Sequence, residues 1–117
     1  MYSAYILTEA SRAKLLEKFV PIFEETILHH ITYKFPDTNP PPEINEVKVV
    51  GYAANDSIEA FVVSLDGEVR RKDGSFYHIT FSLDRLKAKP KDSNNLLKDG
   101  WNKIDPITIE VNPKLLK

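Results

Sequence analysis

The sequence contains one short pattern twice, and each copy places a threonine two positions after a histidine. The copies read His-Ile-Thr-Tyr at 30–33 and His-Ile-Thr-Phe at 78–81. In an extended strand side chains alternate between two faces, so the histidine and the threonine of each copy point to the same side. Each copy is therefore predicted to present an imidazole and a hydroxyl to a cleft, while the residues between them pack into a core.

Two such pairs have the groups that phosphodiester cleavage requires. In-line attack at phosphorus needs one group that takes a proton from the nucleophile and another that gives a proton to the leaving oxygen. Histidine suits both roles because its unperturbed pKa is about 6.5, and a hydroxyl nearby can donate to the non-bridging phosphate oxygens. The sequence thus predicts a catalytic site, with no metal and no cofactor, made of four residues: His30, Thr32, His78 and Thr80.

Two other kinds of catalytic site are weaker interpretations of these histidines. A metal site lacks carboxylate or cysteine partners at ligand spacing, and the sequence has no H-E-x-x-H arrangement. A nucleophilic triad is disfavoured because Ser82, the hydroxyl residue near His78, has no nucleophile-elbow motif around it. Acid–base catalysis by two histidines remains the leading hypothesis.

Strand alternation predicts which neighbours share the cleft and which enter the core. The residues expected on the cleft face are His30, Thr32 and Lys34 in the first strand and Phe76, His78, Thr80 and Ser82 in the second. The residues expected on the core face are His29, Ile31, Tyr33 and Phe35 in the first and Tyr77, Ile79, Phe81 and Leu83 in the second. We interpret His29 as a hydrogen-bonded structural residue rather than a third catalytic group.

Basic residues flank the second copy of the pattern and are candidates for substrate binding. Seven lysines and arginines lie between Arg70 and Lys91, against two acidic residues. They could steer an anionic substrate into the cleft, although an ordinary solvated loop surface is an equal alternative. The predicted substrate-binding residues are Lys34, Arg70, Arg71 and Lys72. Aromatic residues that could stack on a base, but that we expect to pack in the core, are Tyr52, Phe76, Tyr77 and Trp101.

Composition limits the class of protein. With 117 residues, 42% hydrophobic content and no apolar run of membrane-spanning length, residues 1–117 are expected to form a single soluble domain and a monomer. The formal net charge of -1 excludes the strongly basic class that grips duplex nucleic acid through many phosphates. The absence of cysteine, together with the lack of a signal-peptide pattern, favours an intracellular, cytoplasmic setting.

Six strands and one main helix are expected along the chain. A helix should begin after Thr8, turn Leu15, Leu16, Phe19 and Val20 toward a sheet, and stop at Pro21. A turn at 55–57 should join a strand at 46–54 to a buried strand at 58–65, and Gly51 suggests a bulge or a close backbone approach. The remaining strands are expected at 3–7, 27–35, 75–83 and 107–111, with a short helical turn at 93–97. The predicted class is α+β with a mostly antiparallel sheet.

The paired patterns resemble the signature of the 2H phosphoesterase superfamily, in which two H-x-[ST]-x motifs form the active site. The segments at 27–35, 49–67, 77–83 and 93–101 look most like its short RNA-repair and tRNA-ligase-associated branch. One departure is the spacing of 48 positions between His30 and His78, which is shorter than in many LigT-like members. The resemblance implies a compact LigT-like fold that opens RNA 2′,3′-cyclic phosphate ends or small cyclic nucleotides.

Two alternatives stay open beside this hypothesis. The same cleft would also suit a noncatalytic module that holds an RNA end or a nucleotide and acts with an RNA ligase or kinase. A third, weaker alternative is the degradation of a defence nucleotide, which the resemblance permits but which no particular residue of the sequence supports. In either case no membrane partner is expected.

Overall fold

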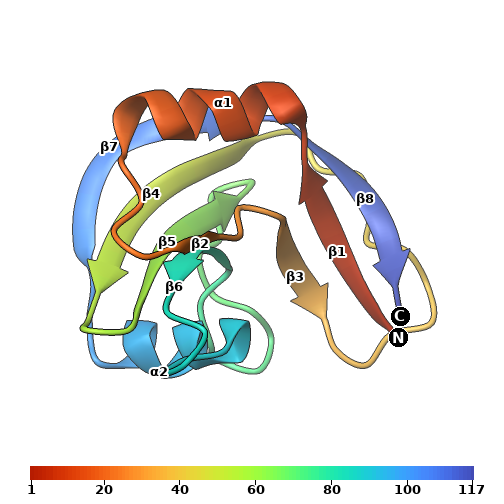
Figure 1. Cartoon of the computed structure of the whole chain (residues 1–117). Helices are drawn as coiled ribbons and strands as arrows, with labels where there is room; N and C mark the ends of the chain where they lie inside the picture. The colour runs from red at the N-terminus through yellow and green to blue at the C-terminus, as the bar shows by residue number, and fades with distance from the viewer.

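Eight strands in two antiparallel sheets, with two α-helices, make up the computed structural model, which describes residues 1–117 (Figure 1). The three-stranded sheet has the order β3 (His30–Lys34), β1 (Tyr2–Leu7), β8 (Val111–Leu116). The five-stranded sheet has the order β2 (Glu25–Thr26), β6 (His78–Leu83), β5 (Ile58–Leu65), β4 (Val47–Ala54), β7 (Asn102–Ile109). The helices are α1 (Glu9–Lys18) and α2 (Ser93–Lys98), and the 3-10 turn η1 (Pro90–Asp92) precedes α2.

The α+β class and the antiparallel pairing are confirmed, whereas the number of elements was wrong. The single final strand expected at 107–111 is two long strands, β7 and β8, with only Glu110 between them. Pro106 and Pro113 argue against such strands, but β7 and β8 both lie at sheet edges, where a proline without an N–H is tolerated. Beside the expected main helix, α2 lies where a short helical turn was expected at 93–97, and neither helix is long and apolar enough to cross a membrane.

Helix α1 begins as predicted but ends early. Thr8 caps it, because its hydroxyl accepts a hydrogen bond from the Ser11 amide at 3.1 Å. The helix ends at Lys18 rather than at Pro21, and Phe19 is already extended. The prediction that Leu16 and Val20 face the sheet was therefore wrong, and their side chains are 41% and 84% exposed.

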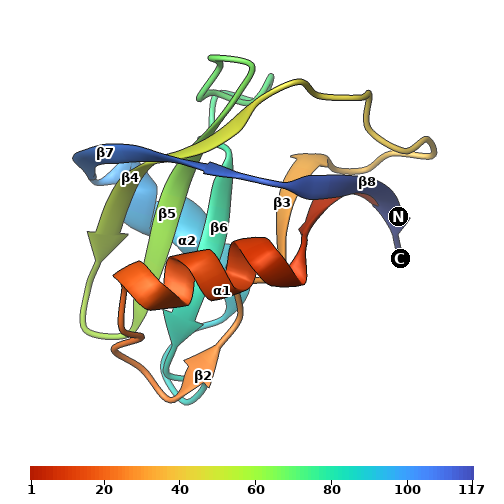
Figure 2. The same cartoon turned by 90° about the horizontal axis from the view of Figure 1, so that it is seen from above.

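The five-stranded sheet is covered on both faces. All eight residues of β5 are buried, and they alternate between two hydrophobic clusters. Leu15 of α1 joins the cluster that contains Phe61, while Leu96 and Leu97 of α2 join the cluster that contains Ala60. The two helices therefore pack on opposite faces of this sheet (Figure 2).

Two segments pass from one sheet to the other. Strands β7 and β8 form one nearly continuous ribbon along both sheets (Figure 2). The second segment starts at β2 and continues beside β6, where the Leu28 N–H donates a hydrogen bond to the Thr80 carbonyl. It then pairs with β1 as strand β3. Leu28, with φ of 41°, makes the change of direction. This crossover places β3 next to β6.

Gly51 has both of the features that its position predicted. The register of β4 shifts between Val49 and Gly51, so the strand carries a bulge. A Cβ atom at this position would lie 2.2 Å from Cε3 of Trp101. The indole therefore packs directly on the backbone of β4.

Candidate active site

The two histidine-threonine pairs line one cavity, although 48 positions separate them in sequence. Strands β3 and β6 are neighbours where the two sheets approach each other (Figure 1). The cavity between them has a volume of about 680 Å³. Its lining consists of Tyr2, Ile27, His29, His30, Thr32, Phe35, Arg71, His78, Thr80, Arg85, Pro90, Lys91 and Asn94. We call it the histidine cavity.

Each motif strand carries a bulge at the aromatic residue that follows the threonine. In β3, Ser3 pairs with Lys34 and Ala4 with Thr32, so Tyr33 is the extra residue. In β6, Ala60 pairs with Thr80 and Glu59 with Ser82, so Phe81 is the extra residue. A bulge reverses the alternation of the residues that follow it.

These bulges correct two predicted positions. Lys34 does not line the histidine cavity but a neighbouring one. Ser82 is fully buried on the α1 side of the sheet, where its hydroxyl hydrogen-bonds to the Glu59 carboxylate. Tyr52 donates to the same carboxylate at 2.5 Å, so Ser82 belongs to a buried polar network of the core and not to the cleft.

His78 is fixed in one tautomer by its own strand. Its Nδ1 lies 3.0 Å from the Phe76 carbonyl, and because a carbonyl can only accept, Nδ1 carries the hydrogen. In the neutral ring Nε2 is therefore the proton acceptor. Burial lowers the pKa of His78, Arg71 lowers it further, and the bond to the Phe76 carbonyl acts in the opposite direction.

His30 is bonded through its ring to His29. The Nδ1 atoms of the two imidazoles lie 2.9 Å apart, so one ring donates and the other accepts. Burial lowers the pKa of His30 to about 4, and the neighbouring His29 and His78 rings add to this effect. His78 acts on His30 because both rings line the same cavity.

The prediction that His29 is a core residue was wrong. His29 is exposed and lines the histidine cavity. Strand β3 begins only at His30, and the left-handed conformation of Leu28 directly before His29 breaks the alternation on which the prediction relied. Leu28 takes the buried position instead.

The two threonine hydroxyls differ in their availability. Thr32 is half-buried in the cavity wall, and no hydrogen bond within the protein engages its hydroxyl. Thr80 is 7% exposed, donates to the Pro90 carbonyl at 3.2 Å and lies 2.9 Å from the Ser93 hydroxyl. Since a hydroxyl has one hydrogen, Thr80 can donate to a ligand only if its hydrogen bond to the Pro90 carbonyl breaks.

The predicted basic residues are divided among three places. Arg71 lines the histidine cavity, and its side chain, 11% exposed, pairs with Asp73 at 3.5 Å. Lys34 and Lys72 line the neighbouring cavity, which Arg71 also reaches. Arg70 contacts neither cavity, because its guanidinium lies 4.4 Å from the centre of the Phe76 ring and donates to the Gly74 carbonyl.

Two further cations in the histidine cavity were not among the predicted binding residues. Arg85 forms an ion pair with Glu25, and Lys91 is exposed. Both belong to the basic run that follows the second motif, so their charge was a usable signal. Their approach to the cavity depends on the fold of the loop between β6 and α2, which the local pattern does not specify.

The aromatic residues at this site are not the predicted ones. Tyr2 and Phe35 line the histidine cavity, with ring centres 6.0 Å apart, and Tyr2 lies 5.7 Å from His30. Phe35 is 67% exposed and does not enter the core as expected, because β3 ends at Lys34.

The four aromatic residues considered for base stacking do not line this cavity. They have contacts elsewhere: Tyr52 with Glu59, Tyr77 stacked on Tyr33, and Phe76 edge-on to Trp101.

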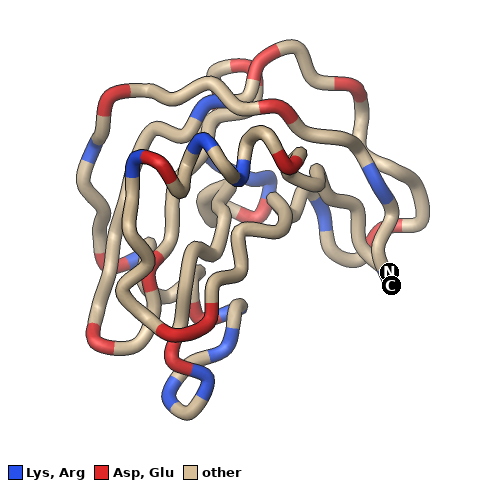
Figure 3. Tube along the Cα trace, turned by 45° about the horizontal axis from the view of Figure 1, so that its top comes forward, with Lys and Arg blue, Asp and Glu red and all other residues tan.

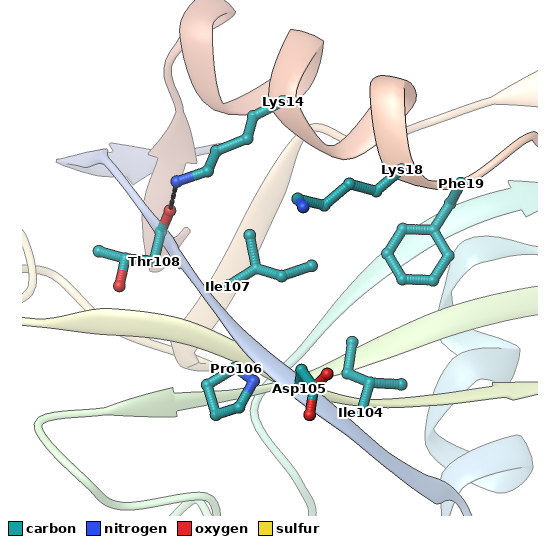
Figure 4. Close-up of a pocket in the computed structure, with 8 residues that line it drawn as sticks. All are labelled: Lys14, Lys18, Phe19, Ile104, Asp105, Pro106, Ile107 and Thr108. Carbon is teal, nitrogen blue, oxygen red and sulfur yellow. Dashed lines mark hydrogen bonds between the residues drawn. The ribbon is translucent and has the colours of Figure 1, made fainter.

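A second groove, between α1 and β7, has a different character. Figure 4 shows Lys14 and Lys18 reaching from α1 over β7, with Lys14 bonded to the Thr108 carbonyl at 2.7 Å. Its volume is about 570 Å³, and Asp105 is its only acidic residue. No pair of proton-transfer groups comparable to His30 and His78 is present in this groove.

No group of three or more histidine, cysteine, aspartate and glutamate side chains gathers closely enough to hold a metal ion. Comparison with protein-family models, with curated proteins and with solved structures finds no match to this chain.

Proposed function

We propose that this chain is a metal-independent phosphodiesterase of the 2H type that opens cyclic phosphates, either at RNA 2′,3′-cyclic ends or in small cyclic nucleotides. One observation carries the proposal: two histidine-threonine pairs from different sheets line a single cavity. An in-line displacement needs proton-transfer groups on both sides of phosphorus, and two strands facing each other supply them. The same arrangement supports a compact LigT-like fold.

The hydrogen bonds at Nδ1 suggest different roles for the two histidines. His78, whose Nε2 is the free acceptor, takes a proton from water as the water oxygen bonds to phosphorus. The bond from phosphorus to one ribose oxygen breaks, and His30 gives that oxygen its proton. The product is a phosphomonoester with a free neighbouring hydroxyl.

The acid must be charged before it acts. In the free protein, burial lowers the pKa of both motif histidines, so both rings are neutral at pH 7. A bound phosphate favours the protonated form of a nearby imidazole, and binding thus raises the pKa of His30 toward the working range. Thr32 and Arg71 hold the phosphate oxygens in this scheme, because both line the cavity and can donate.

A direct assay tests the proposal. Hydrolysis of nucleoside 2′,3′-cyclic phosphates and of RNA with a cyclic end is measured with excess EDTA. Turnover is expected to persist in EDTA and to fall by about 10² to 10⁴ in either His30→Ala or His78→Ala. Lys103→Ala, on the exposed edge strand β7 and outside the cavity, is the control and should retain activity. Retained activity in either histidine variant, with an unchanged melting temperature, refutes the catalytic assignment.

A noncatalytic module is the second candidate. Two observations favour it: the Thr80 hydroxyl is engaged by Pro90, and the lowered pKa of His30 opposes its role as an acid. Such a module would hold an RNA end for an RNA ligase or kinase. Nucleotide binding without turnover on any cyclic substrate would select this function.

A further inference from the structure

A smaller cavity adjoins the histidine cavity and shares part of its wall. Its volume is about 190 Å³, and its lining consists of Tyr33, Lys34, Phe35, Arg71, Lys72, Asp73 and Tyr77. Phe35 and Arg71 line both cavities. We call it the lysine cavity. A ligand bound at the histidines can therefore extend into it past these two side chains.

The lysine cavity is rich in donors that the protein does not use. Lys34 and Lys72 are exposed, and neither forms an ion pair. The Tyr33 and Tyr77 rings stack with centres 6.2 Å apart, and no hydrogen bond within the protein engages their hydroxyls. Tyr33 is half-buried and Tyr77 is 7% exposed, and both line the cavity. Ammonium and phenol groups of this kind match the oxygens of a phosphate.

The charge here differs from that of the surface as a whole. Over the chain, lysines and arginines are interspersed with acidic residues (Figure 3). In the lysine cavity, three cations meet one carboxylate, Asp73, which pairs with Arg71 at 3.5 Å. This pair holds Arg71, whereas Lys34 and Lys72 form no ion pair. A hydrogen bond from Ser3 lowers the pKa of Asp37, and the charge of Lys34 lowers it further. An anion is therefore the ligand class that this cavity favours.

We propose that the lysine cavity binds a second phosphate, the one on the 5′ side of the nucleotide whose cyclic phosphate lies at the histidines. This proposal rests on the proposed function and deepens it, because it selects among substrates. One ribose separates the two phosphates of such a nucleotide, and the shared Arg71 lies between the two cavities. The preferred substrate is then an RNA 3′ end, or a nucleotide with a 5′-phosphate, rather than a nucleoside with only a cyclic phosphate.

Binding of two matched nucleotides provides the test. Adenosine 3′,5′-bisphosphate and adenosine 3′-monophosphate differ only in the 5′-phosphate, and their dissociation constants are measured by calorimetry. The bisphosphate is expected to bind about tenfold more tightly, as one or two charge-assisted hydrogen bonds would produce. The double variant K34A/K72A should lose this difference while its affinity for the monophosphate stays within about twofold. The control K103A should retain it.

Turnover measured in parallel separates this proposal from the proposed function. Adenosine 2′,3′-cyclic phosphate with and without a 5′-phosphate serves as the substrate pair, and the 5′-phosphate should lower KM by a similar factor. If both substrates are hydrolysed but the 5′-phosphate changes neither KM nor affinity, the second phosphate site is wrong and the hydrolase stands. If neither is hydrolysed but the lysine-dependent gain in affinity persists, the hydrolase is wrong and the second site stands. A gain that survives in K34A/K72A overturns the site.

Discussion

The Nδ1 atoms of His29 and His30 lie 2.9 Å apart. His29 is exposed, whereas His30 is half-buried. Burial lowers the pKa of His30 to about 4. A protonated His30 carries hydrogens on both ring nitrogens, so its Nδ1–H donates to Nδ1 of His29. His29 thereby supplies an acceptor that stabilises the charged form of His30.

Replacement of His29 should change how activity depends on pH. Under the proposed function His30 acts as a charged acid, and Nδ1 of His29 accepts a hydrogen bond from its Nδ1–H while Nε2 faces the leaving oxygen. His29→Ala removes this acceptor, and kcat is expected to fall by about tenfold with a shifted acidic limb of the pH profile. Nitrogen NMR of the imidazoles reports the tautomer of His30 directly. His29→Asn, which can still hydrogen-bond to His30, should recover part of the lost kcat. An unchanged pH profile in His29→Ala contradicts the proposed role of His29.

Stability should decrease in mild acid because of the same buried ring. The pKa of His30 is about 4 in the folded protein and about 6.5 in an unfolded chain, so the unfolded state takes up the proton first. The neutral His30 ring contributes fully to the free energy of unfolding above pH 6.5. This contribution, about 2 to 3 kcal/mol in total, is lost as the pH falls toward 4. Urea unfolding at pH 7.5 and pH 4.5 measures it. His30→Asn, which lacks the titrating group, should show a smaller decrease than the unmodified protein, and equal decreases would argue against a buried neutral ring.

The two threonines should respond differently to loss of the hydroxyl. Thr32 has no partner within the protein, so Thr32→Val is expected to lower kcat/KM by about 10- to 100-fold with little change in melting temperature. Thr80→Val should lower the free energy of unfolding by about 1 to 2 kcal/mol as well, because it deprives the buried Ser93 hydroxyl of its partner. Thermal melts and steady-state kinetics on both variants separate the effects. Equal losses of stability would show that Thr80 is not held as described.

Phe35 should contribute to binding rather than to chemistry. Its ring is 67% exposed and lies beside Tyr2 at the histidine cavity, a position suited to stacking on a base. Phe35→Ala is expected to raise KM by about tenfold for a nucleotide and to leave kcat nearly constant. The matched substitution Leu86→Ala, at a residue that is 97% exposed and lines neither cavity, should change neither parameter. A fall in kcat for Phe35→Ala would instead indicate a role in positioning the phosphate.

Gly51 should tolerate no side chain. An added Cβ would lie 2.2 Å from the Trp101 ring, so Gly51→Ala must displace the indole or the strand. The expected loss is about 2 to 3 kcal/mol, which is typical of overpacking in a core. Urea unfolding and the fluorescence of Trp101, the only tryptophan in the chain, measure the two effects. An unchanged emission spectrum together with unchanged stability would mean that the ring is not packed on β4.

Much of the local structure was predictable, because it depends on short-range chemistry. The Thr8 cap, the buried strand β5 and the bulge at Gly51 each follow from residue types within a few positions. His30 with Thr32, and His78 with Thr80, line a cavity from one face of their strands, as strand alternation predicts.

The errors arose where alternation is interrupted by contacts that are distant in sequence. Bulges at Tyr33 and Phe81 moved Lys34 and Ser82, and the turn at Leu28 exposed His29. A bulge depends on the register with a partner strand, which the residues of one strand alone do not specify. The aromatic residues Tyr2 and Phe35 were missed because they lie at or just beyond strand ends, where burial depends on what the adjacent loops cover.

The placement of the two motifs on separate sheets has a consequence for how turnover responds to mutation. His30 is anchored to the three-stranded sheet and His78 to the five-stranded one, so the span between the imidazoles depends on how the sheets dock. Tyr33 of β3 and Tyr77, just before β6, stack with ring centres 6.2 Å apart where the sheets meet. Residues outside the histidine cavity therefore influence the distance between the two imidazoles, so repacking the contact between the sheets should alter any reaction that needs both rings.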